Sequence, residues 1–104
     1  MQLDSTLLGI DLGATNIRVG RVDGQTLSCV ESMPTPADGS VDDVMRSIQS
    51  LIDRHDVTEV EGIGIGVPSV VDVETGIVYD VQNIPSWKEV PVKARLEERY
   101  DRPV

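Results

Sequence analysis

The chain has 104 residues, of which 39% are hydrophobic and only 3% are aromatic, with no phenylalanine. This length suits one domain, whose core must be built from Val, Ile and Leu, as is typical of a sheet covered by helices. The net charge of −9 and the pI near 4.3 argue against nucleic-acid binding through phosphates, because that mode needs a basic face.

Cysteine usage and hydropathy indicate in which cellular compartment the protein is expected. Cys29 is the only cysteine, so no intrachain disulfide can form, and we expect this thiol to fill a small apolar space within a strand. No apolar run approaches the roughly 18 residues of a membrane-spanning helix, and the N-terminus lacks the basic start and long apolar core of a signal peptide. We therefore expect a soluble, cytoplasmic protein with no membrane partner.

Residues 7–23 read LLGIDLGATNIRVGRVD, two apolar runs separated by a short polar turn. In both runs apolar residues are interspersed with polar residues or glycine, which predicts two half-buried strands. The apolar positions are Leu8, Ile10 and Leu12 in the first run and Ile17, Val19 and Val22 in the second.

The turn from Gly13 to Asn16 is a candidate anion site. Glycine permits φ > 0 and lets the backbone approach a ligand, so successive N–H groups can converge on a phosphate, with the Thr15 hydroxyl and the Asn16 amide as further donors. Asp11 lies at the mouth of this turn. A carboxylate beside a phosphate is repulsive unless a cation lies between them, which implies Mg²⁺ held through water. The same residues also fit an ordinary hairpin in which backbone N–H groups satisfy Asp11.

A third strand is predicted over residues 26–33, because Asp23-Gly24 is a two-residue hairpin signal. The three strands would form an antiparallel meander. Pro34 and Pro36 should end this sheet region, since proline cannot donate a hydrogen bond to a ladder.

A helix is predicted to follow Ser40, whose hydroxyl suits an N-cap, with Asp42 and Asp43 at the positive end of the helix dipole. Apolar residues recur at helical spacing, so one face should be buried. These residues are Val41, Val44, Met45, Ile48, Leu51 and Ile52. His55, the only histidine, follows near the helix C-terminus, where we expect a solvated residue and not a catalytic base.

Glycine alternates with apolar residues over 61–68 (EGIGIGVP), which predicts a buried strand with one bare face that a helix or a domain can approach closely. The triplet is not a dinucleotide fingerprint, because its third glycine comes one residue too early. Two short strands over 70–73 and 76–81 are expected to form a hairpin outside the main sheet, followed by a loop over 83–87.

A second helix is expected with Pro91 in its first turn. Its apolar positions are Val92, Leu96 and Tyr100, whereas its charged residues should face solvent. The last four residues, 101–104, read as the start of a further strand.

The predicted order of strands and helices, with a D-x-G-x-T turn after the first strand, resembles the ribonuclease H-like fold of the actin, hexokinase and sugar-kinase superfamily. Within it, GIDLGATNIRVGRVDG resembles the phosphate-binding opening of ROK (repressor, open reading frame, kinase) proteins. The later P-x-x-V-D, T-G and N-x-P-x-W spacing is similar to their strand, hairpin and sugar loop. An α/β fold with a mixed sheet, three antiparallel N-terminal strands and flanking helices is therefore expected.

The resemblance also implies roles for individual residues. Asp11, Gly13 and Thr15 would face the phosphates of ATP and Mg²⁺, with Asn16 assisting, and Asp11 would hold the metal. Asn83 would bind the sugar, because a carboxamide can bridge two neighbouring hydroxyls.

Departures from the family pattern bear on the identity of the sugar. Ser69 stands where many members have glycine near the sugar, and it is a further candidate sugar residue. Ser86 replaces glycine in the N-L-P-G-W form. For Asn83 the residues alone fit equally well a loop amide that caps its own backbone, and for Trp87 packing beneath the loop is favoured over stacking on a sugar.

By this resemblance, residues 1–104 form one N-terminal lobe of a glucokinase-like sugar kinase. The general base, an aspartate, would follow just after Val104, as would the second lobe with the adenine site and a Cys/His zinc cluster. No catalytic base is therefore assigned here. We expect residues 1–104 alone to phosphorylate no sugar and to self-associate along the edge beside residues 61–67.

Three functions follow for the protein as a whole. The first is an ATP-dependent kinase of a hexose or hexose derivative, for which a homodimer is left open. The second is a sugar-sensing ROK repressor, which is disfavoured because only ten residues precede Asp11, too few for a helix-turn-helix. The third is a non-catalytic interaction module. The joint presence of Asp11, Thr15 and Asn83 favours the kinase.

Overall fold

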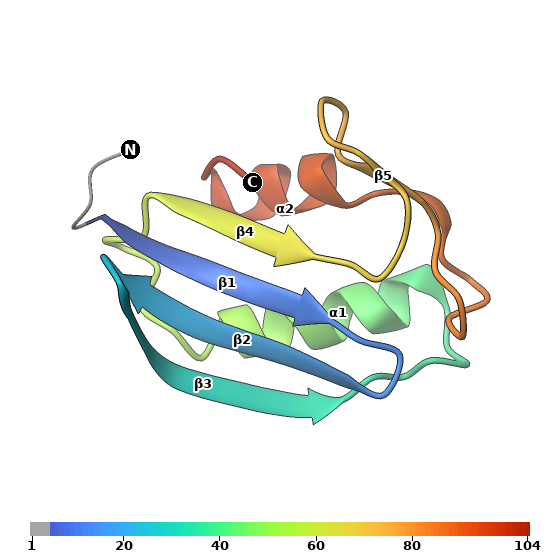
Figure 1. Ribbon diagram of the computed structural model, residues 1–104, viewed down its shortest axis with the longest axis horizontal. Coiled ribbons are helices and arrows are strands. Elements are labelled where there is room, and N and C mark those ends of the chain that lie inside the picture. The colour runs from blue at the N-terminus through green and yellow to red at the C-terminus, as the bar shows by residue number, and fades with distance from the viewer. Residues whose placement is uncertain (1–4) are drawn as a thin grey trace.

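The computed structural model describes residues 5–104 and contains seven strands and two helices (Figure 1). Their bounds are β1 Thr6–Leu12, β2 Asn16–Asp23, β3 Thr26–Pro34, α1 Val41–Ile52, β4 Gly62–Gly66, β5 Val71–Asp72, β6 Ile77–Asp80, β7 Lys88–Pro91 and α2 Val92–Tyr100. The mixed α/β class expected from the sequence is confirmed.

The main sheet has the strand order β3-β2-β1-β4. Strands β1, β2 and β3 form the expected antiparallel meander, whereas β4 pairs with β1 in parallel. The hairpin loop between β2 and β3 is Gly24-Gln25, one residue later than predicted, because Asp23 is still a strand residue opposite Thr26. Gly24 has φ of 60°, which explains why glycine is needed there.

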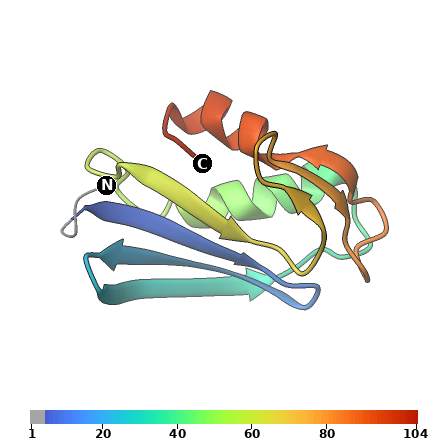
Figure 2. The same cartoon turned by 45° about the horizontal axis from the view of Figure 1, so that its top comes forward.

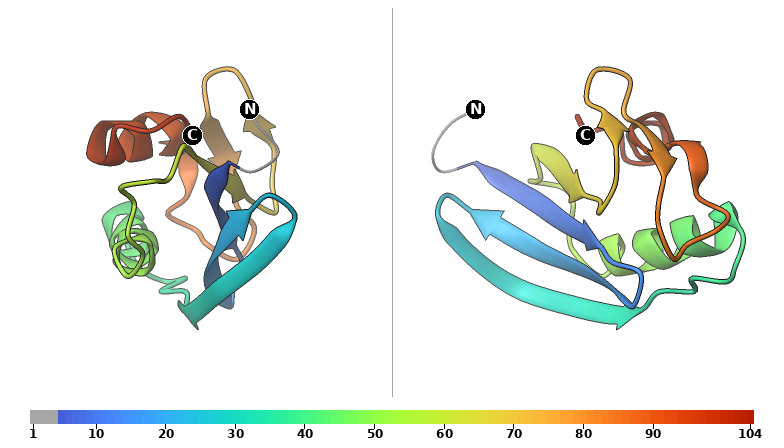
Figure 3. Two further views of the ribbon diagram at one scale, coloured as in Figure 1. Left: turned by 90° about the vertical axis from the view of Figure 1, so that its left-hand side faces the viewer. Right: turned by 45° about the vertical axis from the view of Figure 1, so that its right-hand side comes forward.

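Both helices lie on one face of the main sheet, and within the described residues no helix covers the other face (Figure 3). The core forms between the helices and the inward side chains of β1 and β2, in which Leu8, Leu12 and Ile17 have no exposed surface. Val22 pairs with Leu7 and lies on the opposite face from this core. The predicted N-cap at Ser40 is confirmed, because its hydroxyl accepts from the Asp43 N–H. The Asp43 carboxylate also accepts from the Ser40 N–H, which completes a capping box that was not predicted.

The prediction for Cys29 is wrong, because this thiol is exposed. The ladder between β2 and β3 shifts register between Val19 and Arg21, so Cys29 and Val30 together lie opposite the single residue Gly20. Such a bulge leaves one residue unpaired. Cys29 takes φ of 52° there, and its side chain is directed away from the core.

A second, three-stranded sheet has the order β5-β6-β7. The hairpin β5-β6 of this sheet was predicted, whereas β7 was missed. The prediction that Pro91 lies in the first turn of α2 is wrong by one position, because Pro91 is the last residue of β7 and the N-cap of α2. A proline fits there because its missing N–H leaves no ladder bond unmade at the strand end. Gly76, with φ of 69°, lies against Lys93 so tightly that an added Cβ would stand 2.0 Å from the Lys93 Cβ.

The C-terminal residues run beside β4. The Ile63 N–H donates to the Pro103 carbonyl at 2.8 Å, in line with the predicted strand there, although no strand is formed over 101–104. The Arg102 guanidinium donates to backbone carbonyls of two segments. One is the segment before β4, with the Val60 carbonyl at 2.7 Å, and the other is the end of α2, with the Tyr100 carbonyl at 3.1 Å. This arginine therefore ties the segment after α2 to the segment before β4.

The prediction that His55 is solvated is wrong, because this residue is half-buried. Its Nε2 is buried and has no hydrogen-bond partner among the described residues. None of the helices in residues 5–104 is long and apolar enough to span a membrane.

Candidate functional site

The turn between β1 and β2 lies at the carboxyl end of β1. Since β4 is parallel to β1, with Gly66 opposite Asp11, the carboxyl end of β4 meets the same edge of the sheet. Ser69 follows that end after a bend. The loop between β6 and β7, which carries Asn83, lies at this same end of the molecule (Figure 2). The fold thus brings the predicted phosphate turn and the predicted sugar loop to one end.

The β1–β2 turn is held closed from within and from β3. The Gly13 N–H donates to the Asn16 carbonyl at 3.0 Å. Thr35, just after β3, donates its N–H to the Thr15 carbonyl at 2.9 Å and its hydroxyl to the Gly13 carbonyl at 2.7 Å. Sequence reasoning missed Thr35, because nothing in its local pattern shows that a residue 22 positions away supports the turn.

The reason for glycine at position 13 differs from the expected one. Gly13 is not among the residues with positive φ, and its N–H is already used within the turn. A Cβ at this position would stand 2.9 Å from the Asn16 carbonyl oxygen. Gly13 is therefore needed for the close approach of the two ends of the turn, and its N–H is not available to a phosphate.

Two consecutive backbone donors of the turn do remain free. The N–H groups of Ala14 and Thr15 donate no hydrogen bond within residues 5–104. The side chains of Thr15 and Asn16 are exposed beside them. Adjacent free N–H groups in a tight turn form an anion-binding concavity. The turn thus offers two backbone donors, one hydroxyl and one carboxamide.

Asp11 is exposed at the mouth of this turn, and its carboxylate accepts no hydrogen bond from the described residues. The alternative in which backbone N–H groups satisfy Asp11 is therefore not what the structure shows. Asp11 lines an open hollow of about 480 Å³ on the helix-free face of the sheet. The floor of this hollow is bare because it is formed largely by glycines, namely Gly9, Gly20, Gly64 and Gly66.

No cluster of three or more His, Cys, Asp or Glu side chains that could enclose a metal occurs in the part of the chain that the structure describes. A single free carboxylate fits a different kind of site. Mg²⁺ keeps several waters and is commonly bound through one or two carboxylates together with substrate phosphates. The donor set around Asp11 fits an ion of that kind and would not hold a metal by itself.

Asn83 is the second of the two central residues of a tight turn, closed by a hydrogen bond from the Ile84 N–H to the Val81 carbonyl at 3.1 Å. It has φ of 71°, the left-handed conformation that asparagine tolerates better than most residues. Its side chain is exposed and makes no hydrogen bond with the described residues, so it does not cap its own backbone. The carboxamide is therefore free for a ligand, while the backbone supplies an independent reason for asparagine.

A second turn completes this loop, with the Trp87 N–H donating to the Ile84 carbonyl at 3.0 Å. Trp87 is fully buried, as expected, and packs beneath the loop. The indole Nε1 of Trp87 and the hydroxyl of Ser86 are both buried without a hydrogen-bond partner among residues 5–104. Ser69, in contrast, is half-exposed and makes no side-chain hydrogen bond within residues 5–104.

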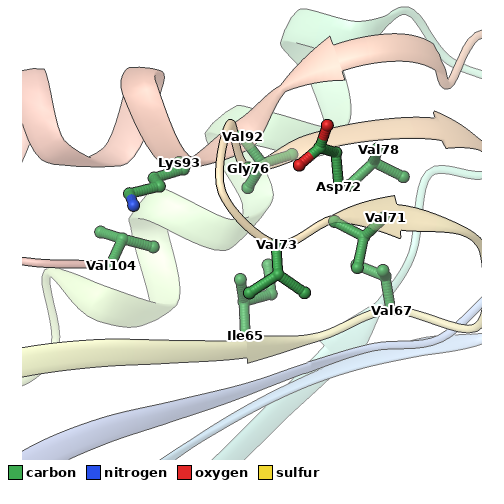
Figure 4. Close-up of a pocket in the computed structure, with 10 residues that line it drawn as sticks. All are labelled: Ile65, Val67, Val71, Asp72, Val73, Gly76, Val78, Val92, Lys93 and Val104. Atoms are coloured by element: carbon green, nitrogen blue, oxygen red, sulfur yellow. The ribbon is translucent and has the colours of Figure 1, made fainter.

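Another cavity, of about 180 Å³, lies between the end of β4, the β5-β6 hairpin and the start of α2 (Figure 4). Its walls are mostly branched aliphatic side chains, with Asp72 and Lys93 as its charged members. None of the predicted site residues lines this cavity. Its lining of aliphatic side chains with a single carboxylate and a single ammonium is therefore separate from the predicted phosphate turn and sugar loop.

Comparison with known proteins shows the family to which the chain is similar. The model of the ROK family matches residues 7–104. The glucokinase of Thermotoga maritima is 35% identical over 100 residues, covering 94% of this chain and 32% of that protein. A putative xylose repressor of Caldicellulosiruptor is 44% identical over only 43 residues, 41% of this chain and 10% of the repressor.

Solved structures of ROK proteins are also similar to this chain. The ROK hexokinase of Thermus thermophilus superposes with a TM-score of 0.83 at 32% identity, over 95% of this chain and 33% of that one. A ROK family glucokinase of Streptomyces griseus, solved in complex with glucose and AMPPNP, gives a TM-score of 0.74 at 29% identity, over 96% and 32% of the two chains.

The fold is therefore the actin-like ATPase fold of the sugar kinases. The chain belongs to the ROK family. It spans about a third of the length of the curated glucokinases that it matches.

Proposed function

We propose that this chain is the N-terminal lobe of an ATP-dependent sugar kinase, which transfers the γ-phosphoryl group of ATP to a hydroxyl of a hexose. The observation that carries the proposal is the pair of free N–H groups at Ala14 and Thr15 beside the unpartnered carboxylate of Asp11. An anion-binding turn next to a free carboxylate suits a nucleotide that arrives as its Mg²⁺ complex.

Within this proposal the β1–β2 turn binds phosphate. Ala14 and Thr15 donate backbone N–H groups, and the side chains of Thr15 and Asn16 add further donors. Gly13 acts by letting the turn close and not by donating. Asp11 would hold Mg²⁺ through water, and the ion would neutralise charge on the phosphates.

The sugar is assigned to the other side of the same end. Asn83 would bridge neighbouring hydroxyls with its free carboxamide, and Ser69, which follows β4, would add a hydroxyl contact. The role of the chain is to hold the two reactants in line, which is the main source of catalysis in phosphoryl transfer. We assign no residue of this chain to the base that takes the hydroxyl proton.

A ROK repressor that senses a sugar is the second candidate, and the 43-residue match to xylose repressors supports it. The two candidates differ in chemistry. A repressor needs the sugar loop but has no use for a nucleotide at Asp11, whereas a kinase needs both.

Steady-state kinetics on the full-length kinase, of which this chain would be the N-terminal lobe, would test the proposal with a panel of hexoses and Mg·ATP. We expect phosphoryl transfer to at least one hexose. Asp11→Asn should lower kcat strongly and change sugar affinity little, because the lost charge matters most in the transition state. Asp38→Asn, a change at another exposed aspartate, should leave both unchanged. Sugar binding without transfer to any hexose would favour the repressor and overturn the proposal.

A further inference from the structure

Most basic side chains of this acidic protein are already engaged. Of nine lysines and arginines, six form ion pairs within the described residues. Arg102 is occupied by backbone carbonyls. The two that remain, Lys93 and Arg18, make neither an ion pair nor a side-chain hydrogen bond within residues 5–104. Lys93 lines the aliphatic cavity beside Gly76, so Arg18 is the free cation that lies near the β1–β2 turn.

The position of Arg18 is defined by the strand register. It lies on β2 directly opposite Asp11 on β1, so the two side chains point to the same face of the sheet. That face is the one without helices (Figure 3), and both residues line the 480 Å³ hollow. They form the outward-facing pair next to the β1–β2 turn, about 7 Å along the strands from its ends at Gly13 and Asn16.

A simple structural role would be a cross-strand ion pair between Arg18 and Asp11. The structure shows no such pair, although the register would allow one. Both charges are instead exposed. An unpaired carboxylate and an unpaired guanidinium therefore flank a turn with two free N–H donors.

We propose that Arg18 binds the terminal phosphates of the nucleotide, on the side of the β1–β2 turn that faces the hollow. This inference rests on the proposed function and adds a residue to its phosphate site. A nucleoside triphosphate carries more negative charge than two N–H groups and one cation neutralise, and the chain itself has a net charge of −9. A guanidinium suits this task because its planar fork binds phosphate oxygens through two parallel hydrogen bonds.

Nucleotide binding by the full-length chain, measured calorimetrically in Mg²⁺ with ATP and with AMP, separates this role from others. Arg18→Gln should weaken ATP binding about ten- to a hundredfold, as expected for loss of charge-assisted hydrogen bonds, and change AMP binding less than about twofold. Arg18→Lys keeps the charge without the fork and should lose less. The matched control is Arg46→Gln, the same charge change on an exposed residue of α1, which should bind both nucleotides as the wild type does.

The possible outcomes are distinguishable. If the wild type binds no ATP, both the proposed function and this inference fail. If the wild type binds ATP and Arg18→Gln binds it equally well, the inference fails and the proposed function stands. An equal loss of ATP and AMP affinity, or a large fall in the unfolding temperature of Arg18→Gln, would show that Arg18 supports the fold of the site and does not contact the terminal phosphates.

Discussion

Two explanations compete for the asparagine at position 83. The tight turn requires a residue that tolerates φ of 71°, and the proposed sugar site requires a free carboxamide. The sequence pointed to the second reason through family resemblance and could not show the first, because a left-handed backbone is visible only in the fold. The two reasons make different demands on a substitute.

Replacing Asn83 by glycine or by alanine separates these demands. Glycine keeps the turn at no steric cost, whereas alanine strains it. If the carboxamide binds sugar, both variants should lose about ten- to a hundredfold in sugar affinity, and ATP affinity should change little. Sugar binding by Asn83→Gly at the wild-type level, combined with a destabilised Asn83→Ala, would show that the turn alone requires asparagine. Titration calorimetry and thermal unfolding of both variants would decide between these results.

One physical reason explains why sequence reasoning missed individual residues of the site. Thr35 supports the β1–β2 turn through contacts with Gly13 and Thr15, far away in the sequence. Arg18 can be recognised as a candidate site residue only once the strand register places it opposite Asp11. Local patterns reveal which residues can donate or accept, whereas tertiary structure decides which of them remain free.

Among the elements, the amphipathic helix α1 was predicted with its cap, because apolar spacing and a serine N-cap followed by acidic residues are both local signals. Strand β7 was missed since its four residues have no periodicity of their own and are ordered by pairing with β6. The bulge that exposes Cys29 also depends on pairing, here between β2 and β3. Elements fixed by neighbours are therefore the ones that the sequence does not reveal.

The contact between α1 and α2 predicts a specific response to alkaline pH. Tyr100 on α2 donates its hydroxyl to Asp53, just after α1, at 2.9 Å. Burial raises the pKa of Tyr100 to about 12 from its ordinary 10.0; the hydrogen bond from Arg99 opposes this and that to Asp53 adds to it. Because the folded state holds this proton more tightly, its contribution to stability is complete below pH 10 and is lost as the pH rises towards 12.

Urea unfolding at several pH values from 9 to 12 would check this response. The wild type should lose more free energy of unfolding over this window than Tyr100→Phe, which has no proton to release. Tyr79→Phe, which removes an exposed hydroxyl on β6 with no such contact, should behave as the wild type. Parallel losses in the wild type and in Tyr100→Phe would contradict the assignment.

For the whole molecule, the two helices occupy one face of the main sheet and leave the other face without a helix (Figure 3). Gly64 and Gly66 of β4 are exposed there. The alternating glycines of residues 61–68 predicted this bare face correctly. The two candidate ligand segments lie at one end, because β1 and β4 are parallel and end at the same edge. This common end makes a two-substrate reaction geometrically reasonable.

The central claim is that the β1–β2 turn binds nucleotide phosphate and that the loop between β6 and β7 binds sugar. Residue-resolved amide hydrogen exchange on the full-length chain tests both halves at once. Adding Mg·AMPPNP should slow exchange at Ala14 and Thr15, whose N–H groups are free in the structure. Adding a hexose should slow exchange within residues 82–86. Protection of Ala14 and Thr15 by the sugar alone, or no protection of either segment by its ligand, would contradict the account.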